Sequence, residues 1–161
     1  MESVADHSTV VLARHGETTW NRERRIQGWA PTSLTEVGRD QARELGRHLT
    51  DSYDVDRLVA SDLRRTRETA RHVARRVDCP VDYDRGWRER SFGVYQGLSY
   101  EALFEGHPEF AVHEVGVAAA SAEPEGGESL LAARERVLDA WDRLVAEVPE
   151  GGTVAVVTHG G

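Results

Sequence analysis

Four side chains suited to phosphate chemistry follow short apolar segments of the chain: Arg14, His15, Arg65 and His159. A phosphate monoester carries almost two negative charges at neutral pH, and the planar guanidinium group of arginine matches its oxygens. A neutral imidazole, with an unperturbed pKa of about 6.5, is already a competent nucleophile near neutral pH. These residue types therefore predict a site that binds a phosphate group and accepts it on a histidine.

The remaining parts of such a site also have candidates. Gly16 and Gly160 lack side chains, so their backbone N–H groups are expected to approach the ligand closely. The departing alcohol needs a proton from an acid, which then acts as the base that activates water. We expect Glu89 in this role, because Glu17 lies next to the nucleophile in sequence. The imidazole also needs an orienting partner on its other nitrogen, which the sequence does not identify.

The apolar pattern predicts the elements that position these residues. Continuous apolar runs predict buried strands over 8–14, 58–60 and 153–158, with a further edge strand over 81–83. Helical spacing of apolar residues predicts helices from the N-cap Thr35 to about Leu49, from Asp62 to about Val77, and from Ser129 to Val148. This alternation predicts an α/β fold, a three-layer sandwich with a mainly parallel central sheet flanked by helices.

The strand ends provide a test of the proposed chemistry. In a parallel sheet, ligands bind at the carboxyl ends of the strands. The three core strands are followed by Arg14-His15-Gly16, by Ser61 with Leu63-Arg64-Arg65, and by His159-Gly160-Gly161. Each core strand should therefore deliver polar or cationic groups to one edge. Arg65 shares its predicted helix with five other arginines, most of which we expect on a solvated face.

The segment from Arg14 to Asn21 resembles the signature of the histidine phosphatase superfamily, which includes cofactor-dependent phosphoglycerate mutases. The resemblance continues in order through Gln27-Gly28, Leu34–Gly38, Ser61–Thr66, Glu89–Gly93, Gly127–Ser129 and Val157–Gly160. It implies a phosphoglycerate mutase-like fold. It also implies that no metal or other cofactor is needed, and no clustered His, Cys or Asp spacing suggests a metal site.

The resemblance implies a role for each matched residue. His15 would be the phosphorylated nucleophile, and Arg14 and Arg65 would hold phosphate oxygens. Glu89 would donate and accept the proton, and His159 would bind the transferring phosphoryl group. The substrate contacts implied are Asn21, Gln27, Gly28 and Gly160. Trp20 and Trp29 could flank the substrate.

We expect phosphomonoester hydrolysis, in which a small phosphorylated substrate gives its phosphoryl group to His15 and then to water. A phosphoglycerate mutase is the alternative within the family. The segment between Gly97 and Gly127 is shorter than the mutase lid and lacks its basic residues, and Gly161 replaces the asparagine usual in mutases. Both differences favour the phosphatase.

A third hypothesis is a phosphate-binding module without turnover. We expect one domain over 1–161 that ends early, directly after the last motif, where family members usually continue through another helix. Such an end is expected to leave an apolar face of the sheet exposed and His159 poorly supported.

Composition limits the partners. The 28 acidic residues outnumber 20 basic ones, all arginine, and the net charge of −8 repels nucleic acid and anionic membranes. The apolar runs are too short to cross a membrane, and Met1–Asp6 does not resemble a secretory signal. A single cysteine, Cys79, excludes an intrachain disulfide and fits a cytoplasmic location. The arginine bias indicates either a GC-rich genome or a halophilic source, and the sequence leaves a homo-oligomer open.

Overall fold

The computed structural model describes residues 7–160. Four strands form one parallel sheet: β1 (Thr9–Arg14), β2 (Arg57–Ala60), β3 (Val81–Tyr83) and β4 (Thr153–Thr158). Their order is β1-β4-β2-β3, and Ala155 of β4 lies between Val11 and Leu58 of its two neighbours. The four predicted strands are confirmed, including the edge position of β3.

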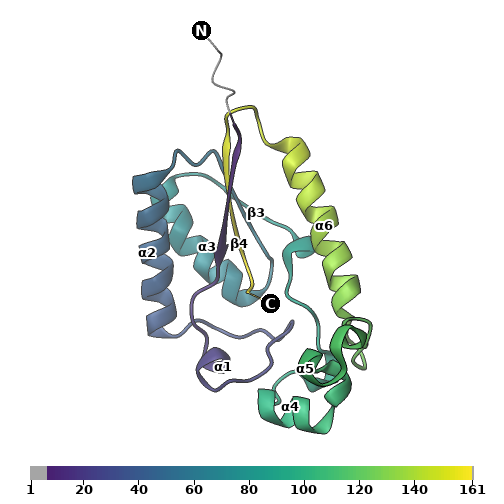
Figure 1. Ribbon diagram of the computed structural model, residues 1–161. Helices are drawn as coiled ribbons and strands as arrows, with labels where there is room; N and C mark the ends of the chain where they lie inside the picture. Colours follow the sequence, from purple (N-terminus) through teal and green to yellow (C-terminus); the bar gives the residue numbers. More distant parts are fainter. Residues whose placement is uncertain (1–6, 161) are drawn as a thin grey trace.

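Helices cover both faces of the sheet (Figure 1). On one face lie α2 (Glu36–Ser52) and α3 (Arg64–Val77), and on the other lies α6 (Leu130–Glu147). Along β4, Ala155 and Val157 pack in the cluster on the α2–α3 side, whereas Val154 and Val156 pack on the α6 side. A strand buried on both faces is apolar throughout, which explains the uninterrupted run in the sequence. The predicted three-layer α/β sandwich is confirmed.

The helix ends follow local capping chemistry. The Thr35 hydroxyl accepts the N–H of Gly38 at 3.0 Å, and Ser129 caps α6 through the N–H of Ala132 at 3.1 Å. Helix α2 continues three residues beyond its predicted end. Helix α3 begins at Arg64 rather than Asp62, because Leu63 adopts the extended backbone of an N-cap residue.

Several apolar residues of the predicted helix over 129–148 and of the predicted first strand are exposed. In α6, Ala133, Ala140 and Leu144 are buried, but Leu130 is 39% exposed and Leu138 41%. Strand β1 forms the edge of the sheet near this helix, and its Leu12 is 56% exposed. The spacing identified an apolar helix face correctly but not how far the sheet extends beneath it. The extent of the domain stays a prediction.

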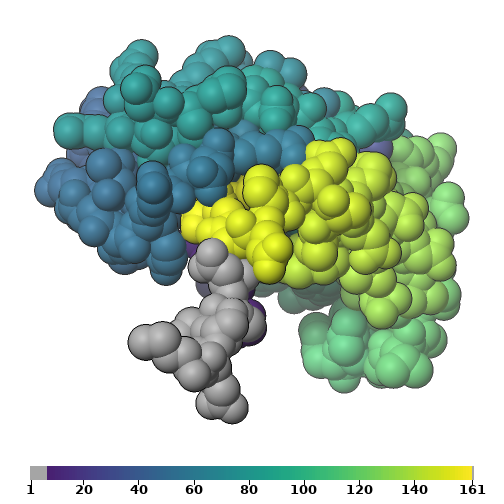
Figure 2. Space-filling view, turned by 90° about the horizontal axis from the view of Figure 1, so that it is seen from above, coloured from purple at the N-terminus to yellow at the C-terminus, as the bar shows by residue number. Residues whose placement is uncertain are grey.

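The sequence did not predict the helices at the carboxyl end of the sheet. They are α1 (Thr19–Arg22), α4 (Tyr100–Gly106) and α5 (Val112–Val115), with 3₁₀ turns at Arg85–Trp87, Gly93–Tyr95, Pro108–Phe110 and Gly116–Ala120. Ile26, Leu103 and Phe110 form a small core of their own there. Seen from above, the yellow C-terminal residues lie between the blue α2 side and the green helical segment (Figure 2). Within residues 7–160, no helix has the length and apolar character of a membrane span.

Candidate active site

The carboxyl ends of the four strands bring the predicted residues to one edge of the sheet. Arg14 ends β1 and His15 follows it, and His159 follows β4. Ser61 follows β2 and leads into α3, whose first turn contains Arg65. The chain beyond β3 reaches Glu89 through the short turn Arg85–Trp87. The predicted convergence of the core strand ends is confirmed.

His15 is buried and held at both ring nitrogens. Its Nδ1 lies 2.7 Å from the Gly16 carbonyl oxygen, and its Nε2 accepts the Nε–H of Arg65 at 3.2 Å. This pattern requires a neutral ring with the proton on Nδ1 and a lone pair on Nε2. Burial, followed by the charge of Arg65, lowers the pKa of His15 to about 4. The orienting partner that the sequence left unidentified is a backbone carbonyl.

Arg65 is the buried arginine of α3, with 1% of its surface exposed. Besides His15, its guanidinium donates to the carbonyl oxygens of Gly28 at 2.9 Å and Ala30 at 3.4 Å. Burial lowers the pKa of Arg65 to about 10, so it stays cationic at neutral pH. Its neighbour Arg64 is instead exposed and pairs with Glu68 at 3.1 Å. The structure thus places the predicted arginine, rather than its neighbour, beside the nucleophile.

Most of the predicted site residues line one cavity of about 210 Å³. They are Arg14, His15, Asn21, Gln27, Gly28, Arg65 and Glu89. Ile26, Phe92, Tyr100 and Phe104 complete the lining, and none of these four was predicted to contact the substrate. The cavity therefore combines two guanidinium groups, one imidazole and one carboxylate.

His159 and Gly160 do not line that cavity. The ring of His159 lies 5.3 Å from that of His15 between centroids, and its Nε2 is 2.9 Å from the Ser61 hydroxyl. Burial, followed by the charge of Arg65, lowers the pKa of His159. Among residues 7–160 its buried Nδ1 has no hydrogen-bond partner. His159 lines a neighbouring cavity of about 470 Å³, and Glu89 borders both.

Gly16 acts differently from the prediction, whereas the predicted role of Gly160 stays a prediction. The Gly16 N–H donates to the Thr69 hydroxyl at 3.1 Å, so it is not free to approach a ligand. A Cβ on Gly16 would lie 2.2 Å from the Gly38 carbonyl oxygen, so close packing of β1 on α2 requires a glycine. Gly160 is exposed, and a Cβ there would meet the Arg14 side chain at 3.0 Å.

The predicted substrate contacts are oriented by internal hydrogen bonds. Gln27 Oε1 lies 2.7 Å from the hydroxyls of both Thr18 and Thr32, and Asn21 Oδ1 accepts the N–H of Thr18 at 3.0 Å. With their oxygens occupied, both amides have their NH₂ groups left for a ligand. Gly28 has a φ of +49° and offers its carbonyl oxygen to Arg65.

Glu89 forms no ion pair with its basic neighbours. Arg88 donates to both carboxylate oxygens of Asp62, at 2.6 and 2.7 Å, and Arg90 donates to the carbonyl oxygens of Glu128 and Ala122. The Glu89 carboxylate accepts only the N–H of Arg90, at 2.9 Å, among the contacts of residues 7–160. The alternative interpretation of Glu89, as a surface residue paired with Arg88 or Arg90, is therefore wrong.

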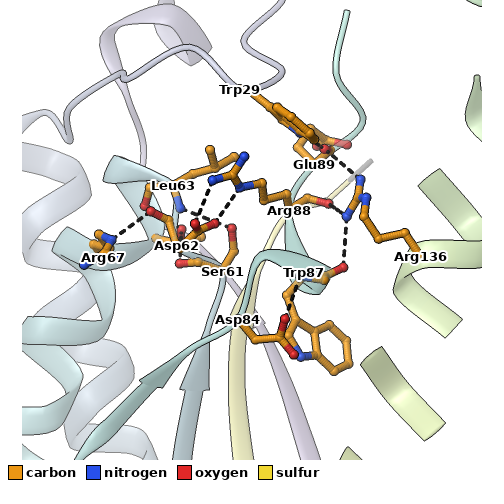
Figure 3. Close-up of polar contacts among 12 residues, drawn as sticks. Trp29, Ser61, Asp62, Leu63, Arg67, Asp84, Trp87, Arg88, Glu89 and Arg136 are labelled. Carbon is orange, nitrogen blue, oxygen red and sulfur yellow. Dashed lines mark hydrogen bonds and ion pairs between the residues drawn. The ribbon is translucent and has the colours of Figure 1, made fainter. Parts of the chain in front are cut away.

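Sequence reasoning missed the residues that surround Glu89 (Figure 3). Trp29 Nε1 donates to the Glu89 carbonyl oxygen at 2.7 Å, and the Arg88 guanidinium lies 4.6 Å from the centre of the Trp29 ring. Arg136 of α6 donates to the same carbonyl oxygen at 3.2 Å. Neither Trp20 nor Trp29 lines the 210 Å³ cavity. These contacts end on backbone oxygens, which leave no signal in a sequence.

Metal-binding groups do not gather in the described part of the chain. No set of three or more His, Cys, Asp or Glu residues within 7–160 is arranged to hold a metal ion.

Comparison with known proteins agrees with this geometry. The chain is 37% identical over 161 residues to phosphoglycerate mutase-like protein 4 of Arabidopsis thaliana, covering 97% of this chain and 68% of that protein. Bacillus stearothermophilus YhfR superposes with a TM-score of 0.82 at 33% identity, covering 96% of this chain and 75% of that one. A mycobacterial glucosyl-3-phosphoglycerate phosphatase gives 0.80 at 33% identity, covering 94% and 75%. Residues 10–161 match the family model of the histidine phosphatase superfamily (branch 1), and the chain belongs to that family.

Proposed function

We propose that the protein is a metal-independent phosphomonoester phosphatase acting on a small phosphorylated substrate. His15 takes the phosphoryl group and passes it to water, and Glu89 donates and then accepts the proton. The observation that carries this proposal is the state of His15, which is buried, neutral and oriented by the Gly16 carbonyl with its Nε2 lone pair facing Arg65. A neutral imidazole held in this way needs no further base to attack phosphorus.

The cavity supports both halves of the reaction. In the first, His15 Nε2 bonds to phosphorus while the ester P–O bond breaks, and Glu89 protonates the departing alcohol. In the second, Glu89 takes a proton from water as the water oxygen attacks the phosphohistidine, which releases phosphate and restores neutral His15. Arg14 and Arg65 stabilise the charge on the phosphoryl oxygens, and each well-placed donor contributes a factor of about 10²–10³ in rate. His159, from the adjacent cavity, offers one N–H donor.

A panel of phosphate monoesters tests the proposal. We expect phosphate release by the wild type, an acid-labile phosphohistidine after rapid quenching, and loss of both in His15→Ala. Release that persists unchanged in His15→Ala would contradict a phosphohistidine intermediate on this residue.

The mutase is the second candidate, since the Arabidopsis relative is named as mutase-like. An assay with 3-phosphoglycerate and 2,3-bisphosphoglycerate distinguishes the phosphatase from the mutase, because a mutase isomerises the phosphoglycerate without net release of phosphate. The absence of Lys and Arg between Gly97 and Gly127 favours the phosphatase. A binding module would show neither reaction but would still bind vanadate.

We also propose where the protein acts and what it does not bind. The lone Cys79 supports a cytoplasmic location, and the acidic surface supports a partner set without nucleic acid or membrane. A homo-oligomer and a halophilic source stay predictions. Unfolding temperatures that do not rise with KCl would exclude the halophilic reading.

A further inference from the structure

The backbone around Glu89 accepts hydrogen bonds from a side chain of α6. Arg136, in the middle of α6, donates to the carbonyl oxygens of Gly86 and Arg88 at 2.9 Å each and to that of Glu89 at 3.2 Å. The Glu89 carbonyl oxygen also accepts the Trp29 Nε1–H at 2.7 Å. Figure 3 shows Arg136 and Trp29 approaching the Glu89 segment from different sides.

Glu128 completes this arrangement. Its two carboxylate oxygens pair with Arg136, and one of them also accepts the N–H of Ser91 at 3.1 Å. The Glu128 N–H in turn donates to the Ser91 carbonyl oxygen at 3.1 Å. The segment is therefore fixed on the far side of Glu89 as well.

The donors of Arg136 are fully used inside the protein. A guanidinium group carries five N–H bonds. Arg136 makes three hydrogen bonds to carbonyl oxygens and two to Glu128, and its side chain is only 19% exposed. No donor is left for a phosphate, so Arg136 is not a third phosphate-binding arginine.

The peptide groups on both sides of Glu89 are held by these contacts. The Arg88 carbonyl belongs to the peptide before Glu89, and the Glu89 carbonyl to the peptide after it. Fixing both sets the direction in which the Glu89 side chain leaves the backbone, toward the cavity that it shares with His15. A displacement of about 1 Å in a reacting group can lower a rate about 10²-fold.

We propose that Arg136 is a positioning residue for proton transfer by Glu89, acting through the backbone carbonyl oxygens of residues 86, 88 and 89. The inference rests on the proposed function, in which Glu89 protonates the leaving alcohol. Lysine cannot replace Arg136, because one ammonium group cannot span three carbonyl oxygens and a carboxylate.

The test compares two substrates that differ in their need for a proton. The leaving group of an alkyl phosphate is a poor alkoxide unless it is protonated, whereas the leaving group of p-nitrophenyl phosphate is a stable phenolate. The measured quantity is kcat/KM, which reports steps through the first phosphoryl transfer. In Arg136→Gln we expect kcat/KM to fall about 10- to 100-fold for the alkyl phosphate and less than about threefold for p-nitrophenyl phosphate.

Two further variants keep the test independent of folding. Trp29→Phe keeps an aromatic ring and removes one donor to the Glu89 carbonyl, so it should show the same selectivity, with a loss of about three- to tenfold for the alkyl phosphate. Arg143→Gln is the matched control on α6: Arg143 is 56% exposed and pairs with Asp84, and both substrates should be unaffected.

The outcomes separate this inference from the proposed function. Equal losses for both substrates in Arg136→Gln and Trp29→Phe would mean a merely structural role and would overturn the inference. A selective loss in Glu89→Gln without one in Arg136→Gln would overturn the inference alone. Absence of a selective loss in Glu89→Gln would instead refute the proton-transfer role of Glu89, and the positioning role with it.

Discussion

The imidazole of His15 is enclosed between the Gly16 carbonyl and the Arg65 guanidinium. Its pKa is about 4 in the folded protein, against about 6.5 in an unfolded chain. Between these values the unfolded state binds more protons, so the free energy of unfolding decreases as the pH falls through this window. Above pH 6.5, His15 is neutral in both states and does not lower stability. By pH 4, its lowered pKa decreases the free energy of unfolding by about 3 kcal/mol.

A comparison with His15→Gln checks this pH dependence. Urea unfolding at pH 7 and pH 4.5 should show a steeper loss of stability in the wild type than in the variant, because glutamine does not titrate. Other groups contribute equally to both proteins and cancel. Parallel slopes would mean that His15 titrates near its usual pKa and is not held neutral by burial.

Arg65 makes contacts that only a guanidinium can make. Its donors reach His15, Gly28 and Ala30 at once. Arg65→Lys should therefore leave carbonyl oxygens unpaired, lower stability by about 1–3 kcal/mol and reduce kcat/KM about 10²-fold or more. The adjacent Arg64→Lys is the control, since Arg64 is 59% exposed, and its stability change should stay within about 0.5 kcal/mol. Similar effects in both variants would contradict the distinct placement of Arg65.

At the scale of the elements, the segment just after β1 contacts the first turn of α2 through Gly16 and Gly38. The Cβ of Gly16→Ala would lie 2.2 Å from the Gly38 carbonyl oxygen, which is backbone and cannot rotate away. We expect a loss of stability of at least about 1–3 kcal/mol, with lower activity because the shift moves His15. Gly106→Ala in α4 meets nothing within 4 Å and should be neutral or stabilising by up to about 1 kcal/mol. Thermal unfolding of the two variants measures the contrast, and equal melting temperatures would refute the close contact.

The same elements show how much of the fold sequence patterns can predict. The continuous run of β4 predicted a strand buried on both faces, and Thr35 predicted a helix start through its capping side chain. The segment from 85 to 120 consists of short turns and helices of at most seven residues, too short for an apolar period to appear. Leu130 and Leu138 belong to the apolar face of α6 and are nevertheless exposed, because periodicity identifies an apolar face but not what packs against it.

The site, too, could be predicted only in part. The strand-end rule predicted that His15, Arg65 and His159 converge, because topology alone brings parallel strand ends together. The partners that orient them could not be predicted. His15 is held by a carbonyl oxygen, and Arg136 reaches Glu89 from a helix 47 residues further along the chain. Backbone oxygens are present at every position, so a sequence cannot indicate which of them will be used.

At the scale of the whole molecule, negative charge predominates, and part of it lies in a cavity beside the site. The net charge is −8, and a second cavity of about 800 Å³ shares Tyr100 and Phe104 with the catalytic cavity. Its remaining lining includes four glutamates with one arginine and one histidine: Glu23, Glu101, Glu105, Glu114, Arg24 and His113. In the proposed reaction Arg14 and Arg65 hold the transferring phosphoryl group, so a second anionic group on the substrate would meet a negative potential here.

The glutamates of the second cavity should therefore make the enzyme select against substrates with a second anionic group. Removing two charges in Glu101→Gln/Glu105→Gln should raise kcat/KM for a sugar bisphosphate about three- to tenfold relative to phenyl phosphate, and 0.5 M KCl should remove most of the gain. The matched control, Glu44→Gln/Asp51→Asn, changes the net charge equally on α2, away from the second cavity. Because screened potentials decay within about 10 Å at moderate salt, the control should alter this ratio little. An equal gain in both double variants would mean that only the overall charge of the molecule repels the bisphosphate.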